Sequence, residues 1–281
     1  MSADRIFVVT GANKGIGYAI VKGLAQQLSN GVIYLTSRNE KLGKESFAKI
    51  VSELDDKKKH KIRYHQLDIT DRKSIDNFAV YLKKEHDGFD VLINNAAFAF
   101  NHNASEPAEL KARITIGTNY YGTKQVCDIL FPLIRSGGRV VNVCSQMGVL
   151  DHRYSDEVIR RFTDPNLTTA DIDNIIKDYE QACIHNNRRE KGFPESAYSI
   201  SKAVMIALTF IQAKELAARN IIVNACCPGY VKTDMTSHKG TLTIEEGAVT
   251  PIYLATLQEN EPNGEFIYLC KPINWVSKRP Q

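Results

Sequence analysis

The chain carries the sequence Thr10-Gly11-Ala12-Asn13-Lys14-Gly15-Ile16-Gly17 directly after a continuous apolar run that begins at Ile6. The run predicts a buried strand, and the segment after the glycines has helical spacing to about Leu28. The glycines allow the backbone to turn sharply and to approach a ligand closely. The helix would present free N–H groups and its positive dipole end, so the unit predicts a phosphate-binding turn. The alternative is a purely structural turn, because the G-x-x-x-G-x-G spacing differs from the usual dinucleotide fingerprint.

Short apolar runs alternate with helix-spaced segments along the rest of the chain. Strands that are apolar throughout and separated by helices indicate a parallel sheet that is covered on both faces. Right-handed crossovers then give a doubly wound, Rossmann-type α/β fold of about seven strands with helices on both faces. The predicted strands are Ile6–Thr10, Val32–Thr36, Ile62–Leu67, Val91–Asn94, Val140–Cys144, Ile221–Cys226 and Phe266–Leu269.

One stretch of about 50 residues, 146–197, departs from this alternation. It is polar, and Ile172, Ile175, Ile176 and Tyr179 within it would share one helix face. We expect an insertion that packs on the same domain, so that residues 1–281 form a single Rossmann-fold domain.

The composition is that of an ordinary globular protein, with 43% apolar and 24% charged residues. The net charge of +4 is small and spread along the chain, so we expect no nucleic-acid partner. No apolar run reaches the roughly 18 residues of a membrane helix, and the few residues before Ile6 are too short for a signal peptide. These features predict a cytoplasmic protein without membrane contact. Six cysteines without C-x-x-C or zinc spacing predict free thiols and no metal site.

The end of the second strand predicts the choice of cofactor. A site for NAD usually has an acidic residue there, which holds the ribose hydroxyls. This chain has Thr36-Ser37-Arg38 instead, with no carboxylate before Glu40. The guanidinium of Arg38 can hold a 2′-phosphate, and Lys14 in the glycine turn adds a second positive charge. The two cations predict NADPH/NADP+, with an ordinary surface arginine as the alternative for Arg38.

Tyr198 and Lys202 form a candidate acid–base pair, because their i, i+4 spacing places them on one helix face. A free tyrosine titrates near pH ~10, which is too high for acid–base chemistry at neutral pH. A neighbouring ammonium group stabilises the phenolate and makes a tyrosine a credible proton donor to an alkoxide. A lone Y-x-x-x-K pattern is common by chance, so its meaning depends on the rest of the chain.

Further motifs follow the glycine turn in a fixed order. They are Asn94-Asn95-Ala96-Ala97, Asn119 within Thr118-Asn119-Tyr120-Tyr121-Gly122, Ser145 at the end of the fifth strand, the Tyr198/Lys202 pair, and Pro228-Gly229-Tyr230-Val231-Lys232-Thr233-Asp234-Met235. In this order they resemble the short-chain dehydrogenase/reductase family over essentially the full chain. The long insertion, Asn13-Lys14, His65-Gln66-Leu67-Asp68-Ile69 and Asn224-Ala225-Cys226-Cys227 make the chain similar to the monomeric NADPH-dependent carbonyl reductases within that family.

The resemblance implies a role for each matching residue. Tyr198 would donate the proton, and Lys202 would hold the nicotinamide ribose and activate the tyrosine. Ser145 would polarise the substrate carbonyl, and Asn119 would help to hold a proton-relaying water. The residues implied at the cofactor are Gly11, Asn13, Lys14, Gly15, Ile16, Gly17, Arg38, Asp68, Ile69, Asn95, Tyr198, Lys202, Val231 and Thr233. Those expected at the substrate are Ser145, Met147, Tyr230 and Met235.

Three positions depart from the family pattern. Ala97 replaces a usual glycine, and its methyl group is expected to bear on cofactor affinity. Cys144-Ser145 replaces a common Ser-Ser, and Ser145 is assigned to catalysis because it ends the strand. Tyr230 stands where related reductases often have tryptophan, which is expected to alter substrate specificity.

Methionine and aromatic side chains at the expected substrate site indicate an apolar, adaptable pocket. The predicted reaction is therefore the NADPH-dependent reduction of small carbonyl compounds, such as quinones, aldehydes and ketones, to alcohols. Two alternatives stay open: a dehydrogenase dedicated to one steroid, prostaglandin or pterin, and a non-catalytic NADPH-binding sensor. In most family members the tyrosine helix helps to form an oligomer interface, which the insertion covers in the carbonyl reductases, so the resemblance implies a monomer.

Overall fold

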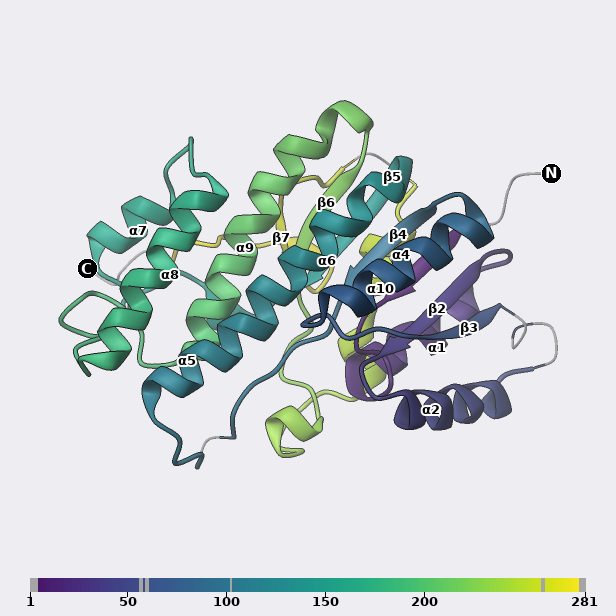
Figure 1. The fold of residues 1–281 in the computed structure, drawn as a ribbon, viewed down its shortest axis with the longest axis horizontal. Helices are drawn as coiled ribbons and strands as arrows, with labels where there is room; N and C mark the ends of the chain where they lie inside the picture. Colours follow the sequence, from purple (N-terminus) through teal and green to yellow (C-terminus); the bar gives the residue numbers. More distant parts are fainter. Residues whose placement is uncertain (1–4, 56–57, 59–60, 102, 259–260, 278–281) are drawn as a thin grey trace.

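A central sheet forms the middle of the fold (Figure 1). The computed structural model describes residues 5–55, 58, 61–101, 103–258 and 261–277, and within these the sheet has eight strands in the order β3-β2-β1-β4-β5-β6-β7-β8. Neighbouring strands are parallel from β3 to β7, whereas β8 is antiparallel to β7. The strands are β1 Ile6–Val9, β2 Val32–Ser37, β3 Ile62–Gln66, β4 Phe89–Asn94, β5 Ile134–Val143, β6 Ile222–Cys227, β7 Phe266–Tyr268 and β8 Lys271–Pro272.

The predicted doubly wound sheet is confirmed, and the structure adds two details. Strand β8 consists of two exposed residues, Lys271 and Pro272, so no apolar pattern announces it. Strand β5 begins at Ile134 rather than at the predicted Val140, because its polar first half pairs with β4 through a shift in register. The order of the strands reverses between β1 and β4, which is where ligands bind in open sheets of this type.

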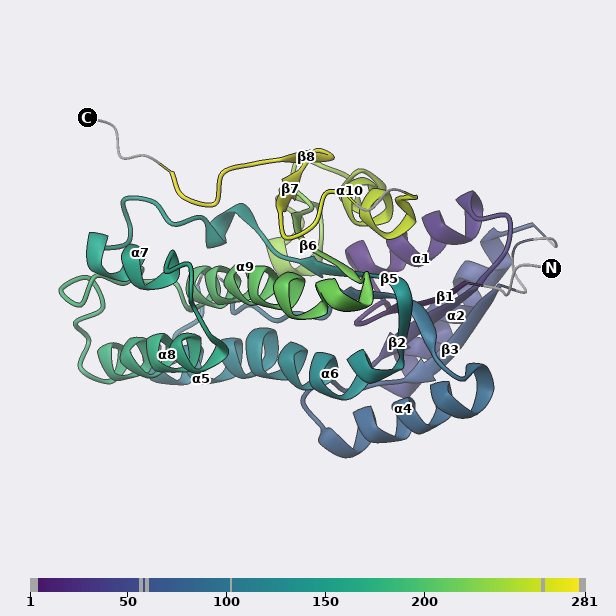
Figure 2. The same ribbon diagram turned by 90° about the horizontal axis from the view of Figure 1, so that it is seen from above.

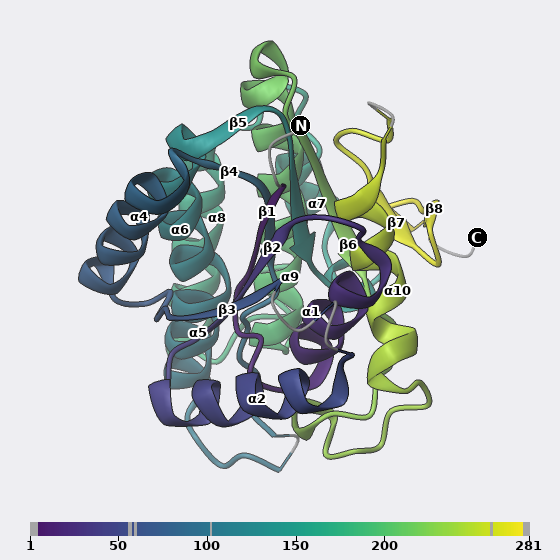
Figure 3. The ribbon, with the colours of Figure 1, turned by 90° about the vertical axis from the view of Figure 1, so that its right-hand side faces the viewer.

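Helices cover both faces of the sheet, as Figures 2 and 3 show. Helices α1, α2 and α10 share one apolar core with the strands, and α4 and α6 share another with the opposite face. Apolar residues on both faces explain why β1 is buried throughout. The α-helices are α1 Gly15–Gln27, α2 Glu40–Glu53, α4 Arg72–His86, α5 Ala108–Ile116, α6 Thr123–Leu130, α7 Asp156–Phe162, α8 Thr169–Ile184, α9 Ala197–Leu216 and α10 Ile244–Thr256.

The stretch between β5 and α9 contains the helices α7 and α8, which lie beside α9 and α5 (Figure 1). A capping box begins α8, since the Thr168 side chain accepts from the backbone N–H of Asp171 and Asp171 bonds back to Thr168. The four apolar residues that predicted this helix are fully buried against α5 and α9. The predicted helical face within residues 146–197 is therefore confirmed.

Helix α9 lies between the sheet and the helices α5 and α8, and most of its residues are buried. Its first turn is capped by Ser196, whose Oγ accepts a hydrogen bond of 3.2 Å from the Ser199 N–H. The cap fixes where the helix begins, and so it fixes the position of Tyr198 in the first turn.

Candidate active site

The glycine turn has the backbone that its sequence predicts. Gly11 and Gly15 have φ of 62° and 57°, in the left-handed region that favours glycine. At Gly17 an added Cβ would lie 2.4 Å from Asn95 Nδ2 and 2.8 Å from the Gly11 carbonyl oxygen. These three positions therefore need glycine for conformation or for space, and α1 packs closely on the end of β4.

Hydrogen bonds join the glycine turn to the end of β4. The Asn95 side-chain amide donates to the carbonyl oxygens of Thr10 at 2.9 Å and Gly11 at 3.1 Å. In return, Thr10 Oγ1 accepts from the backbone N–H groups of Asn95 and Ala96, each at 3.0 Å. The sequence motif identifies Thr10 only as the first residue of the turn and does not predict that it bonds to the end of β4. The feature that indicates this role is a hydroxyl side chain at the end of an apolar strand.

The N-terminus of α1 offers donors and positive charge to an anion. Lys14 stands at its N-cap in an extended conformation, and the first turn of α1 contains no acidic residue. Helix α2, which begins shortly after the exposed Arg38, is tied to the turn by a hydrogen bond of 2.5 Å from Ser46 Oγ to the Asn13 carbonyl. The fold thus brings the segments of both predicted cations to one side of the turn.

Lys14 also forms an ion pair with the segment that follows β6. Its Nζ lies 2.6 Å from Asp234 Oδ2, and this bond holds the pKa of Asp234 below its usual range. His238 Nε2 lies 3.2 Å from the other carboxylate oxygen. Thr233 comes beside Gly15, where an added Cβ would lie 3.3 Å from Thr233 Cγ2. The segment at residues 228–238 therefore lies next to the glycine turn, as expected for residues that would share one cofactor.

Asp68 and Ile69, two of the residues implied at the cofactor, follow the end of β3. The Asp68 carboxylate accepts from the Thr70 N–H at 2.9 Å and from the Thr70 hydroxyl at 2.7 Å, which fixes the loop. Ile69 is buried, and it packs on Gly122, where an added Cβ would lie 3.1 Å from its carbonyl oxygen.

Lys202 is held between the end of β5 and Tyr198. Its Nζ donates to the Val143 carbonyl at 2.8 Å and lies 5.6 Å from the centre of the Tyr198 ring. The side chain of Lys202 is buried, whereas Tyr198 is partly exposed. The predicted pairing along α9 is therefore present, with the ammonium group fixed and the phenol ring open to the exterior.

Ser145 follows β5 and caps a 3₁₀ turn, η3, at Gln146–Gly148. Its Oγ accepts from the Met147 N–H at 3.1 Å. An added Cβ at Gly148 would lie 2.6 Å from the backbone carbon of Lys202, so the turn packs directly on α9. This contact brings the serine turn to the helix that carries the tyrosine and the lysine.

Asn119 lies in a π-helical segment, η1 at Gly117–Gly122, which joins α5 to α6. Its Oδ1 accepts from the Phe98 N–H at 2.7 Å, and its Nδ2 donates to the Phe98 carbonyl at 2.9 Å and to Ser201 Oγ at 3.0 Å. Asn119 thus ties the loop after β4 to α9 beside Lys202. Irregular π turns of this kind occur often at functional sites.

Three of the four residues predicted at the substrate are large apolar side chains with substantial exposure. Met147 is 44% exposed, Tyr230 51% and Met235 40%. Phe98, next to Asn119 in space, is 37% exposed and packs edge-to-face on Phe100 at 4.9 Å. No local pattern singles out Phe98, because its position depends on the fold of the loop.

Arg153 is a second residue that sequence reasoning missed. Its guanidinium donates to Asp151 Oδ1 at 2.7 Å, to Ser199 Oγ at 3.2 Å, and to the carbonyls of Met147 and Val149 at 3.3 Å each. It therefore joins the serine turn to the first turn of α9.

The structure describes the surroundings of two positions that depart from the family pattern, Ala97 and Cys144. Ala97 is not among the residues with positive φ, so its methyl group needs no strained backbone. Cys144 is buried, and burial raises its pKa to about 12, so the residue beside Ser145 is an inert thiol. Burial also raises the pKa of Cys226 and of Cys227, which makes both poor nucleophiles.

The described part of the chain contains no cluster of three histidine, cysteine or acidic side chains placed to bind a metal ion. Every helix among the described residues is too short or too polar to cross a bilayer.

The fold and the site define the class of protein. The family model for the short chain dehydrogenase matches residues 5–154 and 186–242, and the chain belongs to this family. The unmatched gap falls within the insertion before α9.

Individual relatives match nearly the whole chain. Carbonyl reductase (NADPH) 3 of Rattus norvegicus is 39% identical and covers 95% of this chain and 96% of its own. Carbonyl reductase (NADPH) 1 of Homo sapiens is 38% identical, and the match covers 98% of this chain and 99% of the human protein. Among solved structures, salutaridine reductase from Papaver somniferum has a TM-score of 0.83 and 29% identity, with 95% of this chain and 100% of that chain covered. The insertion is thus shared with full-length relatives, since the match extends across it.

Proposed function

We propose that the protein reduces carbonyl compounds to alcohols with NADPH. The observation that carries this proposal is the set of hydrogen bonds running from the glycine turn through Asn95 and, by way of Phe98 and Asn119, to α9 beside Lys202. It supports one continuous site at the carboxyl ends of the parallel strands. Full-length relatives that are named as NADPH-dependent carbonyl reductases support the same reaction.

The residues present fit a dinucleotide phosphate. Left-handed glycines leave room beside the N-terminus of α1, and no acidic side chain in its first turn repels an anion. Lys14 and the exposed Arg38 would hold the 2′-phosphate, and Asn95, Asp68 and Ile69 would line the rest of the cofactor. When bound, the cofactor supplies the hydride.

Ser145 and Tyr198 would act on the carbonyl oxygen of the substrate. The Ser145 hydroxyl oxygen accepts a hydrogen bond from the Met147 N–H. This bond leaves the hydroxyl hydrogen of Ser145 available, so Ser145 can donate it to the carbonyl oxygen of the substrate. The Tyr198 phenol would then give its proton to the developing alkoxide. Lys202 would stabilise the phenolate that remains, because its ammonium group is fixed by Val143 on the face of α9 that carries the tyrosine.

Asn119 would organise the far side of this pair. Both polar atoms of its side chain are bonded to Phe98 or Ser201, so the π-helical segment is held rigidly beside α9. A water placed there would return protons to Lys202.

The substrate side supports broad specificity. Met147, Tyr230 and Met235 present exposed apolar surface, and flexible methionines suit quinones, aldehydes and ketones of different shapes. A dedicated steroid, prostaglandin or pterin dehydrogenase would instead turn over one class of carbonyl alone, which a substrate panel separates.

We infer further that the chain is one domain and a monomer in the cytoplasm. Helix α8 packs on α5 and α9, so the insertion shares the core of the rest and covers the helix surface that family members use for oligomers. The cysteines of the structure are free thiols, as in a reducing compartment. Light scattering tests whether the protein is a monomer, and imaging of a tagged protein tests whether it lies in the cytoplasm.

The reaction is tested by following NADPH oxidation with a quinone and an aromatic aldehyde, for the wild type and for Ser145→Ala. We expect turnover by the wild type and a loss of about 100-fold or more in kcat for the variant, which keeps its NADPH affinity. Tight NADPH binding without turnover of any carbonyl would favour the sensor.

A further inference from the structure

A cavity of about 600 Å³ lies beside the second half of α9, away from the candidate active site. Helix α9 contributes Ala207, Phe210 and Lys214 to its wall, at a spacing that places them on one helix face. Tyr198 and Lys202 lie on the opposite face of the helix, and the cavity begins about 8 Å further along its axis. The cavity is therefore separate from the residues proposed to act on carbonyls.

One wall of the cavity is aromatic and fixed in place. Trp275 is 9% exposed, and its indole N–H donates to the Gly148 carbonyl at 2.9 Å. Its ring meets Phe162 at 5.9 Å and Phe210 at 5.2 Å between centres, both edge-to-face. These contacts hold the wall in one arrangement, so a flat ring could bind without reorganising it.

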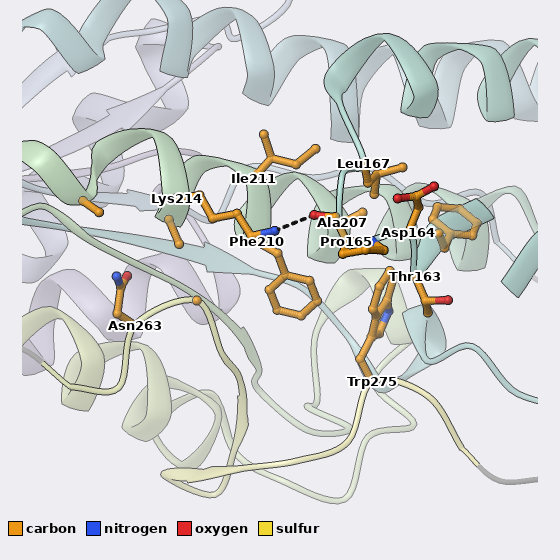
Figure 4. A pocket seen from close by; sticks show the side chains of 14 residues that line it. Thr163, Asp164, Pro165, Leu167, Ala207, Phe210, Ile211, Lys214, Asn263 and Trp275 are labelled. Atoms are coloured by element: carbon orange, nitrogen blue, oxygen red, sulfur yellow. Dashed lines mark hydrogen bonds between the residues drawn. The ribbon is translucent and has the colours of Figure 1, made fainter. Parts of the chain in front are cut away.

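Lys214 gives the cavity a positive charge and hydrogen-bond donors (Figure 4). Lys214 Nζ donates to the Pro165 carbonyl at 3.0 Å, which uses one of its three hydrogens. Asn263 Oδ1 accepts from the Val223 N–H at 3.0 Å, so its amide oxygen is bound to the backbone of β6. Figure 4 draws the Lys214 ammonium group beside the Phe210 ring and directed to Pro165, with Trp275 on one side and Asn263 set apart on the other.

Among the described residues that line the cavity, one is acidic, and it belongs to the other rim. Asp164 Oδ1 accepts from the Asn166 N–H at 2.8 Å, within the turn that precedes α8. Figure 4 draws its carboxylate beside Leu167, away from Asn263. The charge distribution therefore places a negative group of a ligand at Lys214 and keeps it from the Trp275 end.

We propose that this cavity is a second binding site, which takes a small aromatic anion, an aryl carboxylate or sulfonate. The ring would lie against Phe210 and Trp275, and the anionic group would bond to the Lys214 ammonium group. The volume lies within the range of small-molecule sites, and a few polar groups among apolar walls are typical of them.

The test uses 8-anilinonaphthalene-1-sulfonate, an aromatic anion whose fluorescence rises on binding. Saturating NADP+ is present so that the dye does not occupy the cofactor site. We expect saturable binding to the wild type, and a Kd at least about fivefold higher for Lys214→Glu. Lys177→Glu, the same change at an exposed lysine of α8 outside the cavity, is expected to leave Kd within about twofold.

A neutral probe separates the charge from the apolar wall. N-phenyl-1-naphthylamine has similar rings without the sulfonate, and its Kd should be the same for Lys214→Glu as for the wild type. Absence of saturable dye binding, or equal effects of Lys214→Glu and Lys177→Glu, would overturn the proposal. If dye binding decreased while the protein dimerised at high concentration, the proposal would be overturned, and the cavity would instead be the contact surface for a second copy of the chain. Because the two variants are compared directly, these outcomes do not depend on carbonyl reduction.

Discussion

The replacement Gly17→Ala is expected to weaken cofactor binding and to destabilise the fold, because the glycine turn leaves no space for a methyl group at this position. The new Cβ would lie 2.4 Å from Asn95 Nδ2 and 2.8 Å from both the Ala12 Cα and the Gly11 carbonyl oxygen. A relaxed carbon contact needs about 3.5 Å, so α1 must retreat by about 0.7 Å from the backbone of the turn. The two hydrogen bonds of the Asn95 amide would break or lengthen.

Overpacking of this kind costs about 1–3 kcal/mol, and the better helix propensity of alanine offsets up to about 1 kcal/mol of it. We expect a net loss of about 2 kcal/mol, a Tm lower by roughly 4–8 °C, and an NADPH Kd at least about tenfold higher. Calorimetry and fluorescence titration measure these quantities.

Gly117→Ala is the matched control, because an added Cβ there meets nothing within 4 Å and the backbone is helical. It should leave Tm unchanged or slightly higher and NADPH affinity the same. If Gly17→Ala bound NADPH as tightly as the wild type, the account of the turn as a closely packed phosphate cradle would be refuted.

Three further predictions concern charge, positioning and thiol chemistry. Lys14→Ala and Arg38→Ala should each raise the Kd for NADPH by about tenfold while leaving the Kd for NADH nearly unchanged; equal losses for both cofactors would argue against a 2′-phosphate site. Arg153→Ala should lower kcat by about tenfold without changing NADPH affinity, since Arg153 holds the turn that carries Ser145, and Arg153→Lys should restore part of the rate; steady-state kinetics in which kcat is unchanged would remove that role. Titration of the native protein with an aromatic disulfide reagent at pH 8 should find at most one fast thiol, Cys270, because the five other cysteines are buried and burial raises the pKa of each. For Cys144, a pKa of about 12 leaves a thiolate fraction of only about 10⁻⁴ at this pH. A second fast thiol would contradict this burial.

The order of strands and helices could be predicted because parallel strands here are apolar throughout. Strand β1 and the glycines after it form a local signal, and the helical spacing of α8 was visible within a polar stretch. Strand β8 and the first half of β5 carried no such pattern, since Lys271 and Pro272 are exposed and the residues after Ile134 are polar. Their pairing depends on neighbours that are distant in sequence.

In the candidate site, too, local features could be predicted from the sequence, whereas contacts between distant elements could not. Tyr198 and Lys202 are one helical turn apart, so sequence spacing alone predicts that they share a face. The roles of Thr10 and Arg153 depend on bonds across the fold, to the end of β4 and to the first turn of α9. A single sequence contains no signal for such contacts, because each partner is chosen by the packing of separate elements.

The most direct test of the central claim is the rate of the chemical step in Tyr198→Phe with NADPH bound. The variant removes one hydroxyl from a partly exposed ring, so fold and NADPH affinity should stay as in the wild type. In single-turnover experiments with a quinone or an aldehyde, we predict a rate lower by about 100-fold or more. A rate within about threefold of the wild type, with cofactor binding intact, would contradict Tyr198 as the proton donor.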